Sequence, residues 1–294
     1  MTKSEAKSII RKYYRNDNPN EDDEFVFIEA CSYLIETEND PDAMVTLGGL
    51  YYGKQKYDLA EKYYLMADEA GDTWAADGLG YIYYYGRTGE RDYKKAFHYF
   101  SISKSRGNLE AAMKIADMYH NGYGVDKDEA KYKALLLEIY DKVKNLNDIF
   151  SPFPEVAHRL ASIYIDEGKV DLAFPLLEKG KAYITQRIRY NSFWGNFIVA
   201  RRTISLLYQI SELDEDNIDF FDLFYVLAKP NKVRLTYNGN QYEIESFFDE
   251  GEIRVKCLDK YYKSIEDFLR RALFNNRHTY VINFEDFFYL DIIK

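Results

Sequence analysis

The chain has 294 residues, of which 47% are hydrophobic and 30% charged, and its mean hydropathy is −0.48. It contains 29 tyrosines and 19 phenylalanines, which excludes an intrinsically disordered chain because disordered sequences are poor in aromatic residues. The net charge of −10 argues against binding to nucleic acid, which normally requires a basic patch. A chain of this length buries enough surface to fold without disulfide or metal cross-links, and we expect no cofactor and no metal.

We expect no targeting signal in this sequence. The N-terminus, MTKSEAKSIIRKYY, lacks the apolar segment of a signal peptide. No run of 18 apolar residues predicts a membrane-spanning helix. The two cysteines, Cys31 and Cys257, match no metal-ligand spacing and fit a reducing compartment. We therefore expect a cytoplasmic protein that does not bind membranes.

Charge is spread unevenly along the chain. Residues 1–42 carry a net charge of −6, residues 43–190 are neutral, and residues 191–294 carry −4. The simpler interpretation is a solvated acidic surface. The alternative is that the acidic ends attract a basic partner over a long range.

An N-terminal pair of helices is predicted within residues 3–38. Residues 4–15 and 24–37 each place apolar side chains on one stripe at helical spacing. Asp22 or Asp23 is the expected N-cap of the second helix.

Three repeats follow, at about 43–72, 75–108 and 111–144. Each opens with a small residue, an apolar residue four positions later and a tyrosine four positions after that: Ala43/Leu47/Tyr51, Ala75/Leu79/Tyr83 and Ala111/Ile115/Tyr119. Spacing of four places each triplet on one face of a helix. A glycine-bearing turn and a second helix come next, with Asp92 and Asp126 as expected N-caps and Gly71 and Gly107 as expected C-terminal caps. Each repeat is therefore a predicted helix pair, and stacked pairs share a continuous core.

A weaker fourth copy spans about 156–190, with Val156, Leu160 and Tyr164 at the triplet positions. Further helices are predicted within 193–228. We thus expect a helical repeat solenoid over residues 1–230.

The pattern changes after Pro230. Alternating apolar and polar residues flank Asn238-Gly239, a strong signal for a β-hairpin. EIRVKCL is a predicted third strand, and SIEDFLRRALF a predicted helix with Ser264 and Asp267 as its capping box. TYVIN is a possible fourth strand, and FEDFFYLDII fits helix and strand equally. Residues 231–294 are therefore predicted to form a small α+β unit.

The second and third copies resemble Sel1-like repeats, relatives of the tetratricopeptide repeat. The second copy supplies the characteristic positions of that pattern: Ala75, Leu79-Gly80, Tyr83, Gly86, Asp92, Lys95-Ala96, Tyr99 and Gly107. The third copy departs from it, with Tyr132 where the family has alanine. The resemblance covers about residues 43–190. It implies a mainly α fold, a right-handed solenoid of antiparallel helix pairs, and a role as an adaptor or scaffold.

The sequence contains none of the common catalytic motifs. The sequence has no G-x-S-x-G, H-E-x-x-H, C-x-x-C or phosphate-loop motif. The four histidines are scattered, and the repeat spacing puts His120 and His158 on outward faces of two first helices. Cys257 and His278 are the one pair in the C-terminal unit that could support an enzyme. We expect no enzymatic activity.

The outward faces of the first helices are the predicted binding surface. A step of 100° per residue places two positions of each first helix opposite its buried face. These candidate partner-binding residues, on the expected concave surface, are Tyr52, Tyr81, Tyr84, Asp117, His120, Ser162 and Ile165. Tyrosine is frequent in binding hot spots, because its rigid ring buries a large area at low entropic cost. The alternative is that these tyrosines only pack on one another.

Three functions remain open at this point. The first is a non-enzymatic adaptor that binds a peptide or a partner domain on the concave surface. The second is an acidic, immunity-type inhibitor that neutralises a basic toxin or nuclease. The third is an enzyme whose chemistry lies in the C-terminal unit.

Overall fold

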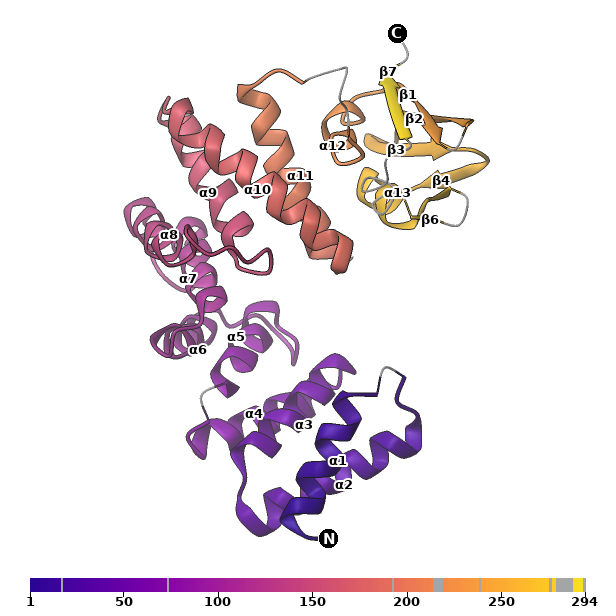
Figure 1. Ribbon diagram of the computed structural model, residues 1–294. Helices are drawn as coiled ribbons and strands as arrows, with labels where there is room; N and C mark the ends of the chain where they lie inside the picture. The colour runs from indigo at the N-terminus through magenta and orange to yellow at the C-terminus, as the bar shows by residue number, and fades with distance from the viewer. Residues whose placement is uncertain are drawn as a thin grey trace. The chain divides into compact units, whose positions relative to one another are not determined.

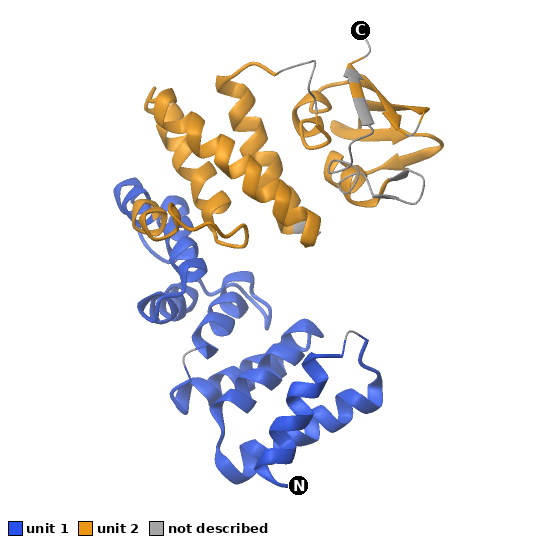
Figure 2. Cartoon of the chain, in the orientation of Figure 1, with its two compact units in different colours: residues 1–135 blue, residues 136–294 orange. Residues whose placement is uncertain are grey.

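Helices dominate the chain, and a small antiparallel sheet follows them (Figure 1). The computed structural model describes residues 1–16, 18–72, 74–191, 193–213, 219–237, 239–274, 277–278 and 288–292. Two compact units are present, residues 1–135 and 136–294 (Figure 2). The predicted fold class, helix pairs followed by a small α+β part, is confirmed. The predicted division into domains at residue 230 stays a prediction.

The first unit consists of consecutive helices that contact their neighbours in the chain. They are α1 (Lys3–Tyr14), α2 (Glu21–Glu38), α3 (Pro41–Gly53), α4 (Tyr57–Glu69), α5 (Ala75–Tyr85), α6 (Tyr93–Ser105) and α7 (Leu109–Asn121). The pairs α1–α2, α3–α4 and α5–α6 are packed together, and each pair also contacts the next helix. Helix α8 (Glu129–Val143) continues through the boundary between the units.

Glycines on the first helices make room for aromatic side chains of the second helices. A Cβ atom on Gly48 or Gly78 would lie 2.6 or 2.5 Å from the Tyr64 ring, and one on Gly80 would lie 2.6 Å from the Phe100 ring. Helices can approach this closely only where one of them lacks a side chain. The leucine–glycine step of the repeat is therefore a packing feature, in which Leu47 and Leu79 are fully buried and the adjacent glycine receives an aromatic ring.

The helix ends confirm some of the predicted caps and correct others. Asp92 caps α6 by accepting a hydrogen bond from the Lys95 amide. The prediction of Asp22 or Asp23 as N-cap of α2 is wrong, because Asn20 is the cap and Asp23 completes its capping box. The prediction of Asp126 at α8 is also wrong.

At α8 the cap lies two residues later. The Asp128 carboxylate accepts from the Lys131 amide at 2.9 Å, and the helix begins at Glu129. The turn before α8 is as long as the turn before α6, so Asp128 occupies the position that Asp92 has in the preceding repeat. Gly71 and Gly107 do follow α4 and α6 with φ values of +83° and +95°, as the left-handed end of a helix requires.

The second unit begins with a helical part and ends with the sheet. Its helices are α9 (Phe153–Asp166), α10 (Val170–Tyr190), α11 (Trp194–Ile210), α12 (Leu223–Val226) and α13 (Ile265–Arg271). Its strands are β1 (Asn231–Tyr237), β2 (Asn240–Asp249), β3 (Glu252–Cys257), β4 (Lys260–Tyr262), β5 (Leu273–Phe274), β6 (Arg277–His278) and β7 (Phe288–Ile292). Helix α9 contacts both α10 and α11.

The main sheet is antiparallel, with strand order β4-β3-β2-β1-β7. Val233, Leu235 and Tyr237 are buried on one face of β1, as the alternating pattern predicts. The predicted hairpin is confirmed, since Tyr237 of β1 pairs with Asn240 of β2. The FEDFFYLDII segment contributes strand β7, whereas TYVIN lies outside the described residues.

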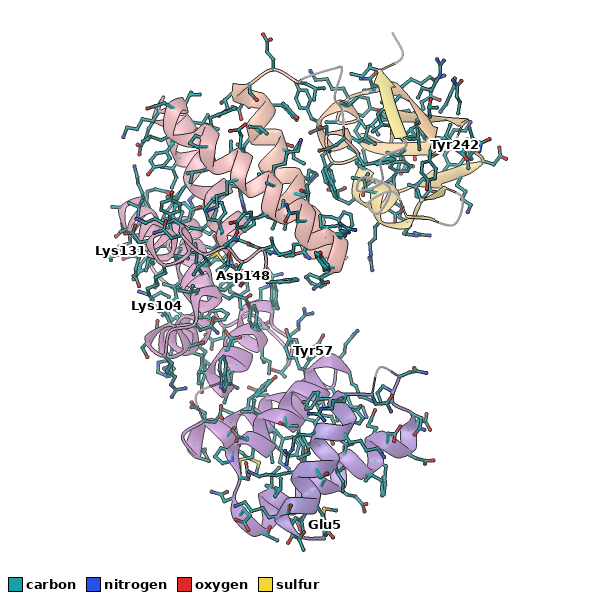
Figure 3. All side chains as sticks on the ribbon, in the orientation of Figure 1. Glu5, Tyr57, Lys104, Lys131, Asp148 and Tyr242 are labelled. Atoms are coloured by element: carbon teal, nitrogen blue, oxygen red, sulfur yellow. The ribbon has the colours of Figure 1, made fainter. Side chains whose placement is uncertain are left out.

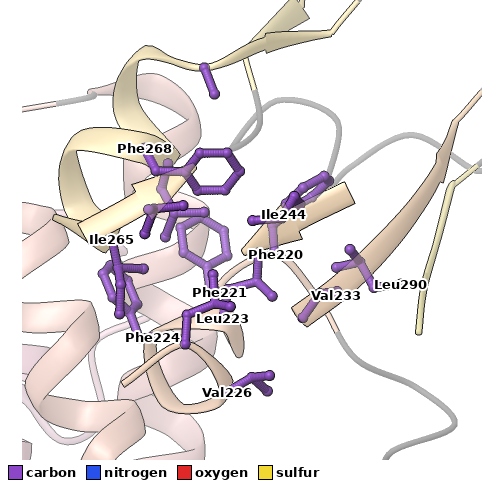
Figure 4. Packing of buried hydrophobic residues seen from close by; sticks show 14 of the residues in the cluster. Phe220, Phe221, Leu223, Phe224, Val226, Val233, Ile244, Ile265, Phe268 and Leu290 are labelled. Atoms are coloured by element: carbon purple, nitrogen blue, oxygen red, sulfur yellow. The ribbon is translucent and has the colours of Figure 1, made fainter. Parts of the chain in front are cut away.

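One hydrophobic core joins the sheet to the helices of the second unit. It includes Ile184 of α10 and Phe197 of α11. Figure 4 shows Phe224 of α12, Ile244 of β2 and Phe268 of α13 in the same core. Ser264 caps α13 as predicted, but the Asp267 carboxylate accepts from the Lys263 amide and not from that of Ser264.

None of the described helices is both long and apolar enough to cross a membrane.

Candidate functional site

Five of the seven candidate residues lie in the first unit. Tyr52 is on α3, Tyr81 and Tyr84 are on α5, and Asp117 and His120 are on α7. The other two, Ser162 and Ile165, are half-buried on α9 of the second unit. A binding surface that continues through all seven residues stays a prediction.

The tyrosines of α5 are held by aromatic contacts. The Tyr81 and Tyr84 rings meet the buried Phe100 ring edge-on, with centroids 5.2 and 6.1 Å apart. Tyr84 also contacts the rings of Tyr85 and Tyr93. Burial, together with the Asp117 carboxylate, raises the pKa of Tyr84 to about 12. Both predicted tyrosines are therefore only half exposed, and part of each ring belongs to the core.

A lysine covers the outer side of these rings. The Lys114 ammonium of α7 lies 5.5, 5.2 and 5.5 Å from the ring centroids of Tyr81, Tyr84 and Tyr85. It also donates a 3.3 Å hydrogen bond to the Tyr85 hydroxyl. These distances fit cation–π attraction. Sequence reasoning missed Lys114, although it precedes Asp117 by three residues and so lies on the same helix face.

An arginine joins this group to the preceding repeat. The Arg87 guanidinium lies 5.1 Å from the Tyr57 ring and 5.0 Å from the Tyr85 ring. Tyr57, labelled in Figure 3, begins α4 and meets the Tyr52 ring edge-on at 5.3 Å. We name the whole group the tyrosine–cation cluster: Tyr52, Tyr57, Tyr81, Tyr84, Tyr85, Arg87 and Lys114. Contacts thus link residues from α3, α4, α5 and α7 into one group.

A half-buried carboxylate lies near the cluster. Burial and the neighbouring Glu110 raise the pKa of Asp77 to about 6. Its Oδ1 atom is buried without a hydrogen-bond partner among the described residues. The Asp77 charge in turn contributes, after burial, to the raised pKa of Tyr81. Asp77 lies in the first turn of α5, and nothing in the sequence indicated that its side chain is half-buried.

The two histidines singled out by the repeat spacing differ from each other. His120 is exposed, as predicted, and its Nδ1 atom lies 3.0 Å from the Glu129 carboxylate. The outward prediction for His158 is wrong, because this side chain is only 5% exposed. Helix α11 packs against α9, which buries a helix face that the sequence reasoning assigned to solvent.

The described part of the chain gives little support for a catalytic site. No cluster of three or more histidine, cysteine, aspartate or glutamate side chains there could hold a metal ion. Cys257 is 2% exposed, and burial raises the pKa of its thiol to about 12, which disfavours the reactive thiolate. The side chain of its predicted partner His278 lies outside the described residues. The absence of enzymatic activity stays a prediction.

Comparison with known families identifies the repeats. A family model described as Sel1 repeat matches residues 41–72, 75–108 and 109–135. The chain thus contains three Sel1 repeats, which confirms the resemblance seen in the sequence. The fourth predicted copy lies outside the matched residues. All of the tyrosine–cation cluster lies within the repeats.

Two curated relatives come from Arabidopsis thaliana, the ERAD-associated E3 ubiquitin-protein ligase components HRD3B and HRD3A. HRD3B is 27% identical over 143 residues, which cover 49% of this chain and 23% of that protein. HRD3A is 27% identical over 98 residues, which cover 33% of this chain and 14% of that protein. The chain therefore aligns with less than a quarter of either relative.

Two solved structures are also similar. One is a protective antigen of uropathogenic Escherichia coli with an SLR fold, at a TM-score of 0.46 and 17% identity, covering 65% of this chain and 46% of that chain. The other is a Sel1 repeat protein from Oxalobacter formigenes, at a TM-score of 0.43 and 14% identity, covering 68% of this chain and 74% of that chain.

Proposed function

We propose that this protein is a non-enzymatic adaptor that binds a peptide or a partner domain on the tyrosine–cation cluster of its Sel1 repeats. The observation that carries the proposal is the cluster itself, in which five tyrosines and two cations from successive repeats form one group. Tyrosine and arginine are the residue types enriched in binding hot spots.

The geometry of the cluster suits binding. Packing on Phe100 and on neighbouring rings fixes the tyrosines, so that little conformational entropy is lost when a partner is bound. Tyr85 remains 41% exposed and can bury further area in a complex. Rigid aromatic anchors of this kind give affinity without a large rearrangement.

The relatives support an adaptor role. HRD3A and HRD3B are named as components of an E3 ubiquitin-protein ligase, that is, of a multiprotein assembly. Both align with this chain over part of its length, and three Sel1 repeats match within it. We infer that the Sel1 repeats of this chain serve protein binding, with a partner of its own.

The test is affinity purification from the native host with the wild-type chain and two variants. In Tyr85→Ser/Lys114→Gln, an exposed ring and a cation of the cluster are removed. Tyr190→Ser is the matched control, because Tyr190 is 70% exposed and lies outside the cluster. We expect the double variant to lose the partner that wild type and control both retain, with melting temperatures within a few degrees. Retention of the same partner by the double variant would contradict the proposal.

The acidic-inhibitor alternative rests on the N-terminal residues. Four acidic residues, Glu21 to Glu24, occupy the first turn of α2 within the segment of net charge −6. This function requires a basic partner whose association rate falls steeply as salt is added. A salt-independent association rate for the purified partner would favour the adaptor over the inhibitor.

A further inference from the structure

We propose a second binding site in the second unit, which takes an acidic peptide segment with a bulky apolar side chain next to a carboxylate. The site is a pocket between the end of α8, helix α9 and helix α10, with a volume of about 360 Å³. It shares no residue with the tyrosine–cation cluster, so the two proposals are independent.

The walls of the pocket are apolar. Phe153 and Leu160 of α9 are buried at 1% and 0% exposure, and Leu172 of α10 remains 46% exposed. The remaining apolar and aromatic lining residues are Tyr140, Tyr164, Pro175 and Leu176. An apolar side chain that enters the pocket would remove this exposed surface from water, and such burial drives association.

The charges at the pocket have one sign. Among the described residues, the charged side chains that line it are Lys144 and Lys179. The Lys144 ammonium pairs with Asp141 at 2.7 Å. The Lys179 ammonium has no carboxylate within ion-pair distance in the part of the chain that the structure describes, and donates to the Lys144 carbonyl oxygen at 2.7 Å. Two cations therefore face the pocket, and one of them lacks a counter-charge.

Lys179 is held against aromatic rings and not extended into water. Its ammonium lies 4.5 Å from the Phe153 ring centroid and 5.1 Å from that of Tyr183. Partial removal of an ammonium from water is unfavourable unless an anion compensates it. A carboxylate of the peptide would supply that anion through a charge-assisted hydrogen bond. A basic peptide would be repelled by both lysines.

The test is a titration of the full chain, labelled with ²H and ¹⁵N, followed by TROSY spectra. The probes are acetyl-Glu-Trp-Glu-amide, acetyl-Lys-Trp-Lys-amide and acetyl-Glu-Ala-Glu-amide. We expect only the first to shift resonances of the α9 and α10 pocket residues in a saturable way. Lys179→Met should weaken this binding about tenfold or more, as loss of a charge-assisted hydrogen bond predicts. Lys142→Met is the matched control, because this exposed lysine of α8 lies outside the pocket.

Several results would overturn the proposal: equal shifts with the lysine peptide, no saturable shifts with any probe, or unchanged affinity of Lys179→Met. If Lys179→Met alters the whole spectrum, the substitution has changed the fold and a second variant is needed. Leu172→Glu then tests the same pocket, and this substitution should abolish binding of the glutamate–tryptophan peptide. The Tyr85→Ser/Lys114→Gln variant should bind the glutamate–tryptophan peptide as wild type does. Failure of this site therefore leaves the cluster proposal standing, and the reverse holds as well.

Discussion

Tyrosines at neighbouring positions of a first helix have different surroundings. Tyr83 stacks on Tyr99 and donates a 2.6 Å hydrogen bond to Glu61, so its role in the repeat is packing. Tyr85, two residues later, is exposed between Arg87 and Lys114. Sequence spacing separates the two sides of the helix, but it does not reveal which cation lies over which ring.

His158 carries a prediction about pH. It is buried as a neutral imidazole beside the Pro154 carbonyl, 3.0 Å from Nδ1, and burial lowers the pKa of His158 to about 3. Below pH 6.5 the unfolded chain takes up a proton at this histidine and the folded chain does not. The free energy of unfolding should therefore fall as pH drops from about 6.5 towards 3, with a slope from this residue that approaches about 1.4 kcal/mol per pH unit.

Urea unfolding of wild type and His158→Asn between pH 7 and pH 4.5 measures this slope. Asparagine keeps a donor near the Nδ1 position but does not titrate, so the variant should depend less on pH than wild type. His98→Asn, at an exposed position, is the control and should keep the wild-type slope. Equal slopes for His158→Asn and wild type would contradict the assignment.

Helix packing depends on the glycines that receive aromatic rings. The sequence predicts the helix pairs, because spacing of four and the caps are local properties. It does not predict why glycine follows leucine inside a first helix, where glycine is unfavourable by about 1 kcal/mol relative to alanine. The structure gives the reason: Tyr64 and Phe100 occupy the space that a side chain would fill.

Gly80→Ala should therefore destabilise the chain. The added methyl group would clash with the Phe100 ring, and overpacking of this kind outweighs the helix propensity gained, for a net loss of about 1–2 kcal/mol. Gly53→Ala is the matched control, because nothing lies within 4 Å of its Cβ position, and it should be as stable as wild type or more so. Thermal unfolding measures the stability of both variants against wild type.

A second substitution tests the cause. In Gly80→Ala/Phe100→Leu the smaller side chain should recover part of the stability lost through Gly80→Ala, so that the two effects are not additive. If Gly80→Ala were as stable as Gly53→Ala, the ring would not be what requires glycine.

At the scale of the whole molecule, the second unit combines helices and sheet in one core. A charged network supports this arrangement. The Lys181 ammonium of α10 lies 2.5 Å from Asp222 and 3.3 Å from Asp219, in the segment that leads to α12. The Tyr208 hydroxyl of α11 donates to Asp222 at 2.7 Å. Burial opposes the charge of Lys181, but the two carboxylates raise the pKa of Lys181 above its ordinary value.

Lys181→Met should destabilise the second unit. It leaves the Asp222 side chain, which is 3% exposed, without its cation, and breaking a buried pair from one side costs about 3 kcal/mol or more. The double variant Lys181→Met/Asp222→Asn should lose less stability than the sum of the losses of the two single variants. Urea unfolding measures the free energy of unfolding of wild type, the two single variants and the double variant. Lys232→Met is the control, because Lys232 forms an exposed pair with Glu243 at 3.7 Å. Strictly additive losses would show that the pair does not interact.

The sequence by itself determined the helix pairs, the Sel1 repeats and the β-hairpin after Pro230. These features depend on spacing along one segment, which the residues of that segment specify. Only the tertiary structure decided that Lys114 covers the tyrosine rings and that α11 helps to bury His158. It also decided that α10 and α11 share a core with the sheet. These features depend on side chains from other elements, whose position no local pattern records.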